Sequence, residues 1–487
     1  MSVILCILLV ASWLSICAGI TLPTRLTGLV PVTTLSWDPE NMVPPESNPW
    51  LEDASFEVKR ALSFWQQVIH IYGSYKLCQA RAFVTRRDKA EQKAIIEALH
   101  DVNSDRLLDL CMNLRGFYIK TGQFLGTRYD FMPRIYCTKL QKLVDSVPPM
   151  PSDICRDIIE DDFGGDIDEI FDELDLEGVL GAASVAQVHK GIWKATGEPV
   201  AVKLQYPGVE VRMRRDLRNI RALAEFLQRL ELKFDMLSAI KELQRQIRFE
   251  FDFPREAANM DFAHESLNRL KINDIRVPKS VAATERVLIM TYIDGVNLSQ
   301  LAELKSDYIP AAVKRAKGAK LFKKLAKVYG AMFFEMGKMH GDPNPGNISL
   351  KGKQVGLVDW GQVKDVTPAF KKKVAKLVLA FNARDREGIC KALFDVGVKV
   401  THPEDKATVE AIAVTMLDTR IMEGYPSDPF DERCASFANP ILLMPPEIYF
   451  LVRSVQMMRG LTSAFQLDFS LAKEWGPLAS KYARRKV

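Results

Sequence analysis

Apolar residues recur at intervals of three and four from residue 56 onwards, which is the spacing of one face of an α-helix. This spacing continues to about residue 128 and predicts several helices there. Between 166 and 206 it gives way to alternating β-branched residues with turn signals between the runs, which predicts a β-meander. The turn Thr196-Gly197-Glu198-Pro199 precedes the last predicted strand, 200–204.

Helical spacing then dominates the rest of the chain. The run Val287–Gly295 is an exception and predicts an edge strand that leads into a connector. A β-rich region followed by many helices indicates an α+β protein. The predicted helical stretches are 209–248, 313–336, 368–383, 386–397, 405–416 and 446–466.

The N-terminal segment has a different pattern. No charged side chain occurs from Ser2 to Thr24, and residues 3–10 are strongly apolar, so residues 1–19 are interpreted as a signal peptide or signal anchor. Residues 20–55 are predicted to be a leader and linker that resembles a transit peptide; a disordered leader without an address is the alternative. No other stretch of 18 or more uncharged apolar residues occurs, so no further spanning helix is expected.

Length, net charge and cysteine content limit the domain organisation and the kinds of partner that the chain could have. A chain of 487 residues is too long for one core, so two or three lobes are expected. The formal net charge of +5 is too small to argue for nucleic acid as a partner. The eight cysteines include no C-x-x-C pair, which argues against a zinc site.

Candidate chemistry is concentrated in the loop His340-Gly341-Asp342-Pro343-Asn344-Pro345-Gly346-Asn347. Its prolines and glycines exclude helix and central strand. Protein-kinase-like phosphotransferases place an Asp near the attacking group and an Asn five residues later on a metal ion. A second Asp, after a short apolar strand and before a glycine, lies on the same metal. Asp342, Asn347 and Asp359 have this order and spacing. The alternative is a turn with solvated polar residues.

A lysine that could hold phosphates lies in the last predicted strand of the meander. Ala201-Val202-Lys203 resembles the strand whose lysine binds the α- and β-phosphates of ATP in kinases. A lone A-V-K more often belongs to a strand with its lysine at the surface. Here a segment that could fold over a nucleotide, called the flap, begins at Gly181, 22 residues before Lys203, which is about the spacing of a two-strand nucleotide flap. The flap residues are Gly181, Ala182, Ala183, Ser184 and Val185. Alanine restricts positive φ and close phosphate approach, so altered nucleotide handling is expected.

Two further segments could complete a nucleotide site. A carboxylate must orient Lys203, and both Glu256 and Glu250 are candidates. The strand containing Met290 and Tyr292 ends in a connector suited to a hinge whose backbone meets an adenine ring.

Two helical features are explained, when taken alone, by helix faces exposed to solvent. Lys120 and Gln123 share one face of a predicted helix, where a solvated face is the simpler account. The predicted helix 313–336 contains seven cations without an acid among them, from Lys314 to Lys327. Such a helix can dock on an anionic membrane surface, although solvation is again simpler.

Taken together, these motifs resemble the UbiB/aarF-domain-containing (ADCK-type) atypical kinase family. The K-x-G-Q and E-x-D signatures are specific to that family, and the motifs occur in family order over roughly residues 60–487. The matching pieces are Lys120–Gln123 (K-x-G-Q), Gly181–His189 (the alanine-rich loop), Ala201–Lys203, Glu250–Asp252 (E-x-D), Arg255–Ala257, His340–Asn347 and Asp359–Gly361.

The resemblance implies a bilobal protein-kinase-like fold with an N-terminal helical K-x-G-Q extension. It divides the chain into the extension at 56–165, a kinase-like N-lobe with inserted helices at 166–290 and a helical C-lobe at 291–487. The extension would cover the peptide site, Lys120 would pair with Glu250 and Asp252, and Glu256 would pair with Lys203. One departure is Trp360 in place of the usual Phe after Asp359.

The resemblance also implies a function. ATP and Mg²⁺ are the expected cofactors, with Asp342, Lys203 and Glu256 in catalysis and Asn347 and Asp359 on the metal. The expected activity is an atypical kinase or ATPase that supports isoprenoid quinone or lipid metabolism, with peripheral membrane contact, a possible quinone-biosynthesis complex and a location in a plastid or mitochondrion. A protein Ser/Thr kinase is disfavoured because there is no room for a long activation segment, and a nucleotide-binding pseudokinase scaffold is the third alternative.

Overall fold

The computed structural model describes residues 54–85, 88–126, 132–140, 142–143, 149–182, 185–230, 236–298, 311–342, 345–420, 435–464 and 467–484. Of the leader predicted over residues 1–55, residues 1–53 lie outside these ranges, and residues 54–55 belong to the first helix. The chain forms two compact units that divide after Leu114. Within the described ranges, no helix combines the length and the apolarity that crossing a bilayer requires.

The first unit is a pair of long helices, α2 (Ala54–Thr85) and α3 (Lys89–Leu114), which pack against each other. Apolar residues predicted from the spacing of three and four contribute to the contact, and Phe64 is buried. Arg60 is also buried and donates a hydrogen bond to the carbonyl of Leu114.

The second unit begins with the helices α4 (Phe117–Gly126), α5 (Arg134–Leu140), α6 (Ser152–Phe163) and α7 (Ile167–Ile170). The predicted meander follows as strands β1 (Phe171–Ala182), β2 (Ala186–Trp193) and β3 (Glu198–Gln205). The predicted helical stretch 209–248 is two helices, α8 (Val209–Leu230) and α9 (Met236–Glu250). Helix α4 therefore belongs to the same unit as the sheet, although the expected extension grouped it with α2 and α3.

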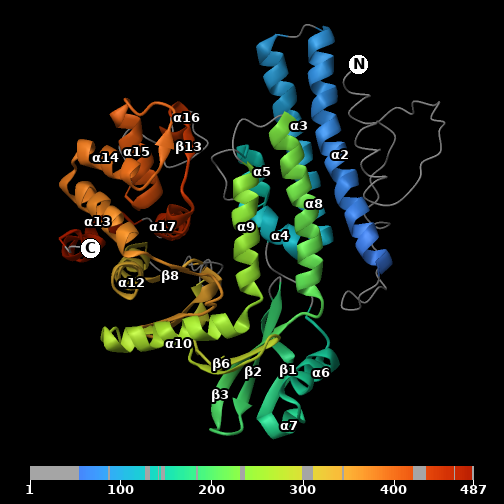
Figure 1. Cartoon of the computed structure of the whole chain (residues 1–487), viewed down its shortest axis with the longest axis vertical. Coiled ribbons are helices and arrows are strands. Elements are labelled where there is room, and N and C mark those ends of the chain that lie inside the picture. The colour runs from blue at the N-terminus through green and yellow to red at the C-terminus, as the bar shows by residue number, and fades with distance from the viewer. Residues whose placement is uncertain are drawn as a thin grey trace. The chain divides into compact units, whose positions relative to one another are not determined.

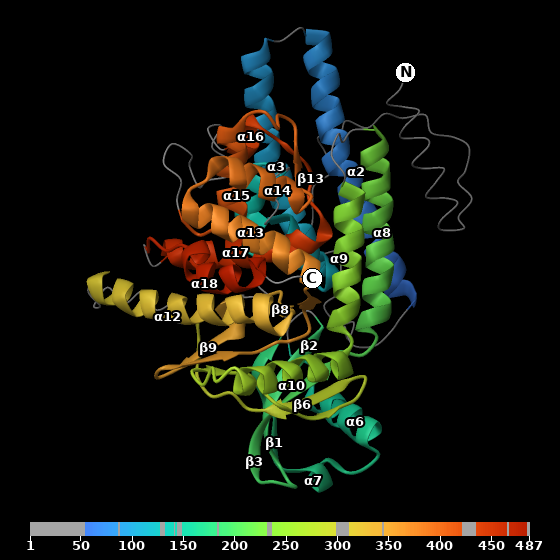
Figure 2. The same cartoon turned by 60° about the vertical axis from the view of Figure 1, so that its left-hand side comes forward.

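An antiparallel five-stranded sheet forms the N-lobe, in the order β1-β2-β3-β6-β5, with β5 at Ser280–Ala283 and β6 at Val287–Thr291. The strand predicted from residue 287 is β6, but β5 lies outside it, so it is not an edge strand. Helix α10 (Phe253–Arg269) runs alongside β5 and β6 (Figures 1 and 2).

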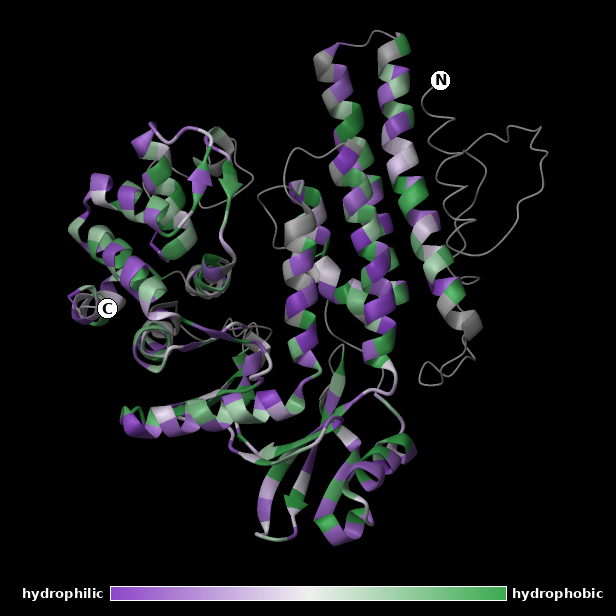
Figure 3. Cartoon of the chain, in the orientation of Figure 1, coloured by the Kyte–Doolittle hydropathy of each residue, from purple (hydrophilic) through white to green (hydrophobic). Residues whose placement is uncertain are grey.

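Helix α10 has a mixed character that matters for the site. Hydrophobic and hydrophilic residues alternate along it (Figure 3). Its buried stripe contains Phe253, Met260 and Leu267, but also the polar residues Glu256 and Asn259. Buried polar side chains require partners, and both of these residues bind the segment that follows Leu357.

The C-lobe begins with a small sheet in the order β4-β10-β9-β7. Its strands are two to four residues long and were not predicted individually, except the apolar strand before Asp359. They are β4 (Ile275–Arg276), β7 (Val296–Asn297), β9 (Ile348–Lys351) and β10 (Gln354–Leu357). A second pair, β8 (Lys338–His340) and β11 (Val363–Asp365), brackets the loop that carries Asp342.

Helices make up most of the rest of the C-lobe, close to their predicted bounds. The predicted helix 313–336 is α12 (Ala311–Ala331), which continues as a π-helical turn, η3 (Met332–Met336). The core packs Phe333 and Trp475 face to face, with ring centroids 6.3 Å apart. The remaining elements are α13 (Pro368–Ala383), α14 (Arg386–Asp395), β12 (Lys399–Val400), α15 (Lys406–Leu417), α16 (Ala435–Ala438), β13 (Ile441–Leu443), α17 (Pro446–Ala464) and α18 (Leu471–Ala483).

Candidate active site

Lys203 and Glu256 form the centre of the site. Lys203 lies on β3 and donates to both carboxylate oxygens of Glu256, at 3.0 and 2.9 Å. The side chain of Glu256 is only 1% exposed, so it has almost no access to water. The choice between Glu256 and Glu250 as the partner of Lys203 is therefore settled geometrically in favour of Glu256.

Asp359 is the second acid beside Lys203, at 3.8 Å from the ammonium to Oδ1. Burial acts to lower the pKa of Lys203, but the charges of Asp359, Glu256 and Glu250 outweigh it and raise the pKa above its ordinary value. Burial acts to raise the pKa of Asp359, and Lys203 and Lys120 together lower it. Both groups are thus charged near neutral pH.

The backbone of Asp359 is held in an unusual conformation. Its φ is +62°, in the left-handed region that residues other than glycine rarely adopt. His340 supports this conformation, because its Nε2 lies 2.8 Å from the carbonyl oxygen of Asp359 and its Nδ1 lies 3.2 Å from the hydroxyl of Tyr329. Burial lowers the pKa of His340, so the ring is neutral, donating from Nε2 and accepting at Nδ1.

Helix α10 fixes the residues after Asp359 by four hydrogen bonds. Glu256 accepts from the backbone N–H of Trp360 at 3.2 Å, and Asn259 donates to the Trp360 carbonyl at 3.3 Å. Arg255 donates to the carbonyls of Gly361 and Val363, at 3.1 and 3.0 Å. Neither Arg255 nor Asn259 was expected to have a role in the site, although both are in the helical turn around Glu256.

Trp360 fills the position where a kinase usually has Phe. It is almost fully buried, packs edge-on against His340 with ring centroids 4.9 Å apart, and donates from its indole N–H to the Leu357 carbonyl at 3.0 Å. The indole therefore packs as an aromatic and adds a hydrogen bond that Phe could not make.

Asp342 and Asn347 lie together in the loop after β8. Asn347 donates to the carboxylate Oδ2 of Asp342 at 3.3 Å and to its carbonyl at 3.2 Å. The other carboxylate oxygen accepts from Arg453 at 2.9 Å. Arg453 lies on α17, 111 residues away in sequence, and was not among the expected site residues.

Of the two contacts expected between the K-x-G-Q and E-x-D signatures, the structure shows one. The ammonium of Lys120, on α4, lies 4.0 Å from Oε1 of Glu250. The pairing expected with Asp252 is not found, because Asp252 is the N-cap of α10 and accepts from the backbone N–H of Arg255 at 2.9 Å. The side chain of Gln123 lies outside the part of the chain that the structure describes.

The flap and the hinge are described only in part. Gly181 and Ala182 end β1, and Val185 is buried, whereas Ala183 and Ser184 lie outside the described residues. Met290 is buried in β6, and Tyr292 donates its backbone N–H to the Pro199 carbonyl at 3.0 Å. That N–H is used within the sheet, so the hinge expected here has no free backbone donor at Tyr292.

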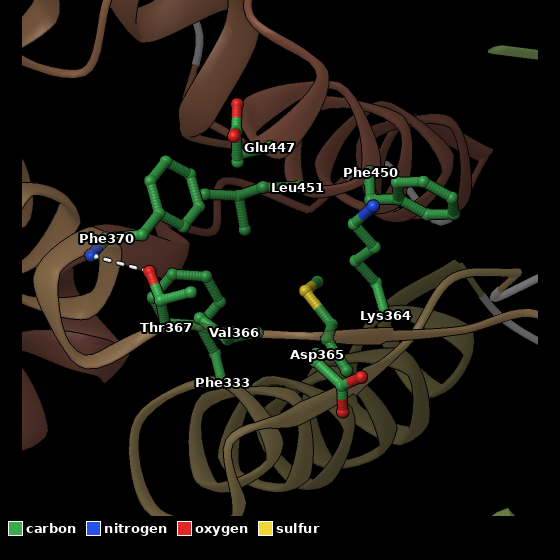
Figure 4. Close-up of a pocket in the computed structure, with 10 residues that line it drawn as sticks. Phe333, Lys364, Asp365, Val366, Thr367, Phe370, Glu447, Phe450 and Leu451 are labelled. Carbon is green, nitrogen blue, oxygen red and sulfur yellow. Dashed lines mark hydrogen bonds between the residues drawn. The ribbon is translucent and has the colours of Figure 1, made fainter.

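A small apolar pocket lies near the loop but contains none of the residues above (Figure 4). It is bounded by the side chains of Phe333, Phe370, Phe450 and Leu451, with Lys364 and Glu447 at its polar edge. Its walls come from η3, β11, α13 and α17. The pocket is therefore separate from the Lys203 site.

Known proteins resemble this chain in sequence and in fold. Residues 142–393 match the model of the ABC1 atypical kinase-like domain. The chain is 28% identical over 353 residues, 70% of its length and 44% of the relative's, to the protein ACTIVITY OF BC1 COMPLEX KINASE 8, chloroplastic, of Arabidopsis thaliana. It is 30% identical over 307 residues, 61% of its length and 57% of the relative's, to AarF domain-containing protein kinase 1 of Xenopus laevis.

The chain thus spans about half the length of these curated relatives. A solved structure, the complex of Rv3197 with erythromycin from Mycobacterium tuberculosis, has the same fold, with a TM-score of 0.53 and 20% identity over 81% of this chain and 100% of that one. These matches confirm the family and the kinase-like fold expected from the motifs. The chain belongs to the ABC1 (AarF/UbiB-type) atypical kinase-like family.

Proposed function

We propose that this chain is a Mg-ATP-dependent ATPase or phosphotransferase that acts on a small or lipid substrate in isoprenoid quinone or related lipid metabolism. The observation that carries the proposal is the position of Lys203, which pairs with Glu256 and lies 3.8 Å from Asp359. A charged lysine held by a buried acid beside a second, half-exposed acid is the arrangement that phosphoryl transfer uses.

The available donors suit Mg-ATP. Mg²⁺ prefers oxygen ligands and usually shares them between one or two protein groups and substrate phosphates. The Asp359 carboxylate, 47% exposed, and the amide oxygen of Asn347 would supply the protein ligands. Among the described residues no group of three or more His, Cys, Asp or Glu could hold a metal alone, which fits a site shared with phosphates. When bound, Mg²⁺ would neutralise the phosphate oxygens.

Each side chain then has a simple task. Lys203 holds the phosphates by its charge, and Glu256 orients Lys203 without competing water because it is buried. Asp342, held by Asn347 and Arg453, orients or deprotonates the attacking hydroxyl or water. Catalysis is mainly positioning and charge neutralisation.

Two features support the proposed substrate class. Helix α4 carries Lys120 and is joined to the site by the Lys120–Glu250 pair, in the unit that contains the kinase-like body. Helix α13 begins at Pro368, nine residues after Asp359, which leaves no room for the long activation segment that receives peptides in protein kinases. Both features favour a small or lipid substrate over a protein.

Membrane contact would be electrostatic. On α12, Leu325 and Tyr329 are buried in the core, whereas Lys320, Lys323 and Lys327 are exposed. The apolar face of α12 is therefore occupied within the fold and cannot insert into a bilayer. Its cationic face would attract anionic headgroups without insertion. The chloroplastic relative favours a plastid location for the protein.

The test is ATP turnover by the purified chain with three acceptors: anionic liposomes alone, liposomes carrying a phenolic quinone-precursor mimic, and a generic protein. Turnover stimulated by the liposomes or the mimic is expected, and Asp359→Asn should abolish it. If the wild type binds no Mg-ATP, both the proposal and the protein-kinase alternative fail; binding without turnover would favour the nucleotide-binding pseudokinase scaffold. Label transfer to protein alone would favour a protein kinase.

A further inference from the structure

The cation that binds the loop carboxylate Asp342 comes from far along the chain. Between Lys338 and Lys351 the sequence contains no lysine or arginine, so the loop supplies no cation of its own. Arg453 of α17 fills this role, with Nη2 donating to Asp342 Oδ1 at 2.9 Å. Arg453 and Asp342 are 29% and 15% exposed, so water screens the pair only in part.

The same arginine continues into a second contact. Its Nη1 donates to the side-chain oxygen of Gln362 at 2.9 Å, and the Gln362 amide nitrogen donates to Glu250 at 2.7 Å. Glu250 in turn lies 4.0 Å from Lys120. A continuous chain of polar contacts therefore runs from α4 to Asp342.

The side chain of Gln362 suits this place because it can donate and accept at once. Its neighbours are a guanidinium, which only donates, and a carboxylate, which only accepts. An amide satisfies both at once through its oxygen and its nitrogen. Glutamate would repel Glu250, and leucine would leave both charged neighbours without this contact.

Helix α17 also fixes the loop by packing. Phe450 lies three residues before Arg453, so the two share a face of the helix. A Cβ atom placed on Gly341 would lie 2.8 Å from Phe450 Cδ1, so the ring rests directly against the loop residue next to Asp342. The backbone N–H of Gly341 donates to the Gln362 carbonyl at 2.7 Å. Gly341 is thus held from both sides.

We propose that Arg453 and Gln362, called here the Arg453–Gln362 bridge, are positioning residues that make the orientation of the Asp342 carboxylate depend on the Lys120–Glu250 pair. This inference rests on the proposed function for its catalytic meaning. Arg453 holds one carboxylate oxygen and Asn347 the other, which limits rotation of the Asp342 side chain. A substrate or partner that displaces α4 alters the Lys120–Glu250 pair and with it the hydrogen bond from Gln362 to Glu250. This change reaches Asp342 through Arg453.

The experiment compares Arg453→Ala, Arg453→Lys, Gln362→Leu and Lys120→Ala, alone and as the Lys120→Ala/Arg453→Ala double variant. Arg459→Ala is the matched control, because Arg459 lies on the same helix and donates to the carbonyls of Val414, Thr415 and Asp418. The measurements are kcat and KM for Mg-ATP, nucleotide affinity, and hydrogen–deuterium exchange of residues 117–126.

Arg453→Ala should lower kcat by about 10- to 100-fold with KM for Mg-ATP within about 2-fold, because misorientation affects the reacting group and not nucleotide binding. Arg453→Lys should recover part of the loss, since it retains the charge without the forked geometry. The double variant should lose less than the product of the single losses. Losses that multiply independently would overturn the coupling.

Hydrogen exchange tests whether the Arg453–Gln362 bridge is coupled to α4, independently of activity. Arg453→Ala and Gln362→Leu should each speed exchange in residues 117–126 about 3-fold or more, while Arg459→Ala should not. If the wild type has no turnover but the variants show this pattern of exchange, the proposed function is refuted and the bridge is supported. Unchanged exchange, or equal effects of Arg453→Ala and Arg459→Ala, refutes the bridge.

Discussion

Lys203 donates to both carboxylate oxygens of Glu256, and Glu256 uses one of the same oxygens to accept from the backbone N–H of Trp360. One buried acid therefore joins the sheet of the N-lobe to the segment that carries Asp359. This contact holds the phosphate-binding lysine and a proposed metal ligand in a fixed relation.

Breaking this pair from one side should cost both stability and turnover. Lys203→Met leaves Glu256 buried without its cation, which should lower the free energy of unfolding by about 3–5 kcal/mol. The double variant Lys203→Met/Glu256→Leu should recover part of that stability but no turnover. Two apolar residues replace the buried charges in packing only, and the backbone N–H of Trp360 loses its acceptor. Urea unfolding and ATP hydrolysis measure the two effects. A double variant that recovers activity would contradict the role of Lys203.

The charge of Asp359 predicts a specific pH dependence. Its pKa lies below the ordinary value of 3.8 because Lys203 and Lys120 outweigh the effect of burial. A carboxyl group with a lowered folded-state pKa stabilises the fold above its unfolded pKa and loses this contribution as pH falls through the folded value. The difference in unfolding free energy between wild type and Asp359→Asn should thus be constant from about pH 6 to 8 and change below about pH 4 in favour of the variant. A difference that stays constant down to pH 3 would refute the lowered pKa.

His340 should support Asp359 through one nitrogen. His340→Leu removes the donor to the Asp359 carbonyl and leaves the Tyr329 hydroxyl without its partner, at a cost of about 1–3 kcal/mol. His340→Gln keeps a donor near the position of Nε2 and should retain more turnover at equal nucleotide affinity. Thermal unfolding and single-turnover rates of the two variants test this. Equal losses of turnover in both would argue that packing against Trp360, and not the hydrogen bond, is what matters.

The cationic face of α12 should set affinity for anionic vesicles. Replacing Lys320, Lys323 and Lys327 by Gln should weaken binding roughly 100-fold at low salt, since each lysine near a membrane surface contributes about 1 kcal/mol. The matched control replaces three exposed lysines of other helices, Lys373, Lys376 and Lys391. Vesicle co-sedimentation with phosphatidylserine measures both. If the control weakens binding as much, net charge and not α12 determines the contact.

The helices were predictable because their apolar periodicity is long and regular; α13 begins at Pro368 and ends at Ala383, as the spacing indicates. Most strands of the small C-lobe sheet were not predictable, because two to four residues are too few to show a period of two; β10 was expected only from its place before Asp359. Asp252 illustrates an overlooked local signal. An Asp directly before Phe253-Pro254 is a typical N-cap with proline in the first turn, and it fills that role in the structure.

The grouping of Asp342, Asn347 and Asp359 was predictable from motif order, since the three residues are close in sequence. Arg453 was not, because it lies 111 residues from Asp342 and is one of 66 lysines and arginines, with no local pattern to distinguish it. Only tertiary packing of α17 against the loop brings it to the site. The residue types alone left both Glu256 and Glu250 open as partners of Lys203; the family resemblance favoured Glu256, and the structure shows that pairing.

The most direct test of the central claim is calorimetric titration of the purified chain with Mg-ATP, alongside Asp359→Asn and Lys203→Met. The account predicts saturable wild-type binding that requires Mg²⁺, markedly weaker binding by both variants, and turnover in the wild type alone. Binding by Asp359→Asn that equals the wild type in affinity and in Mg²⁺ dependence would contradict the site described here.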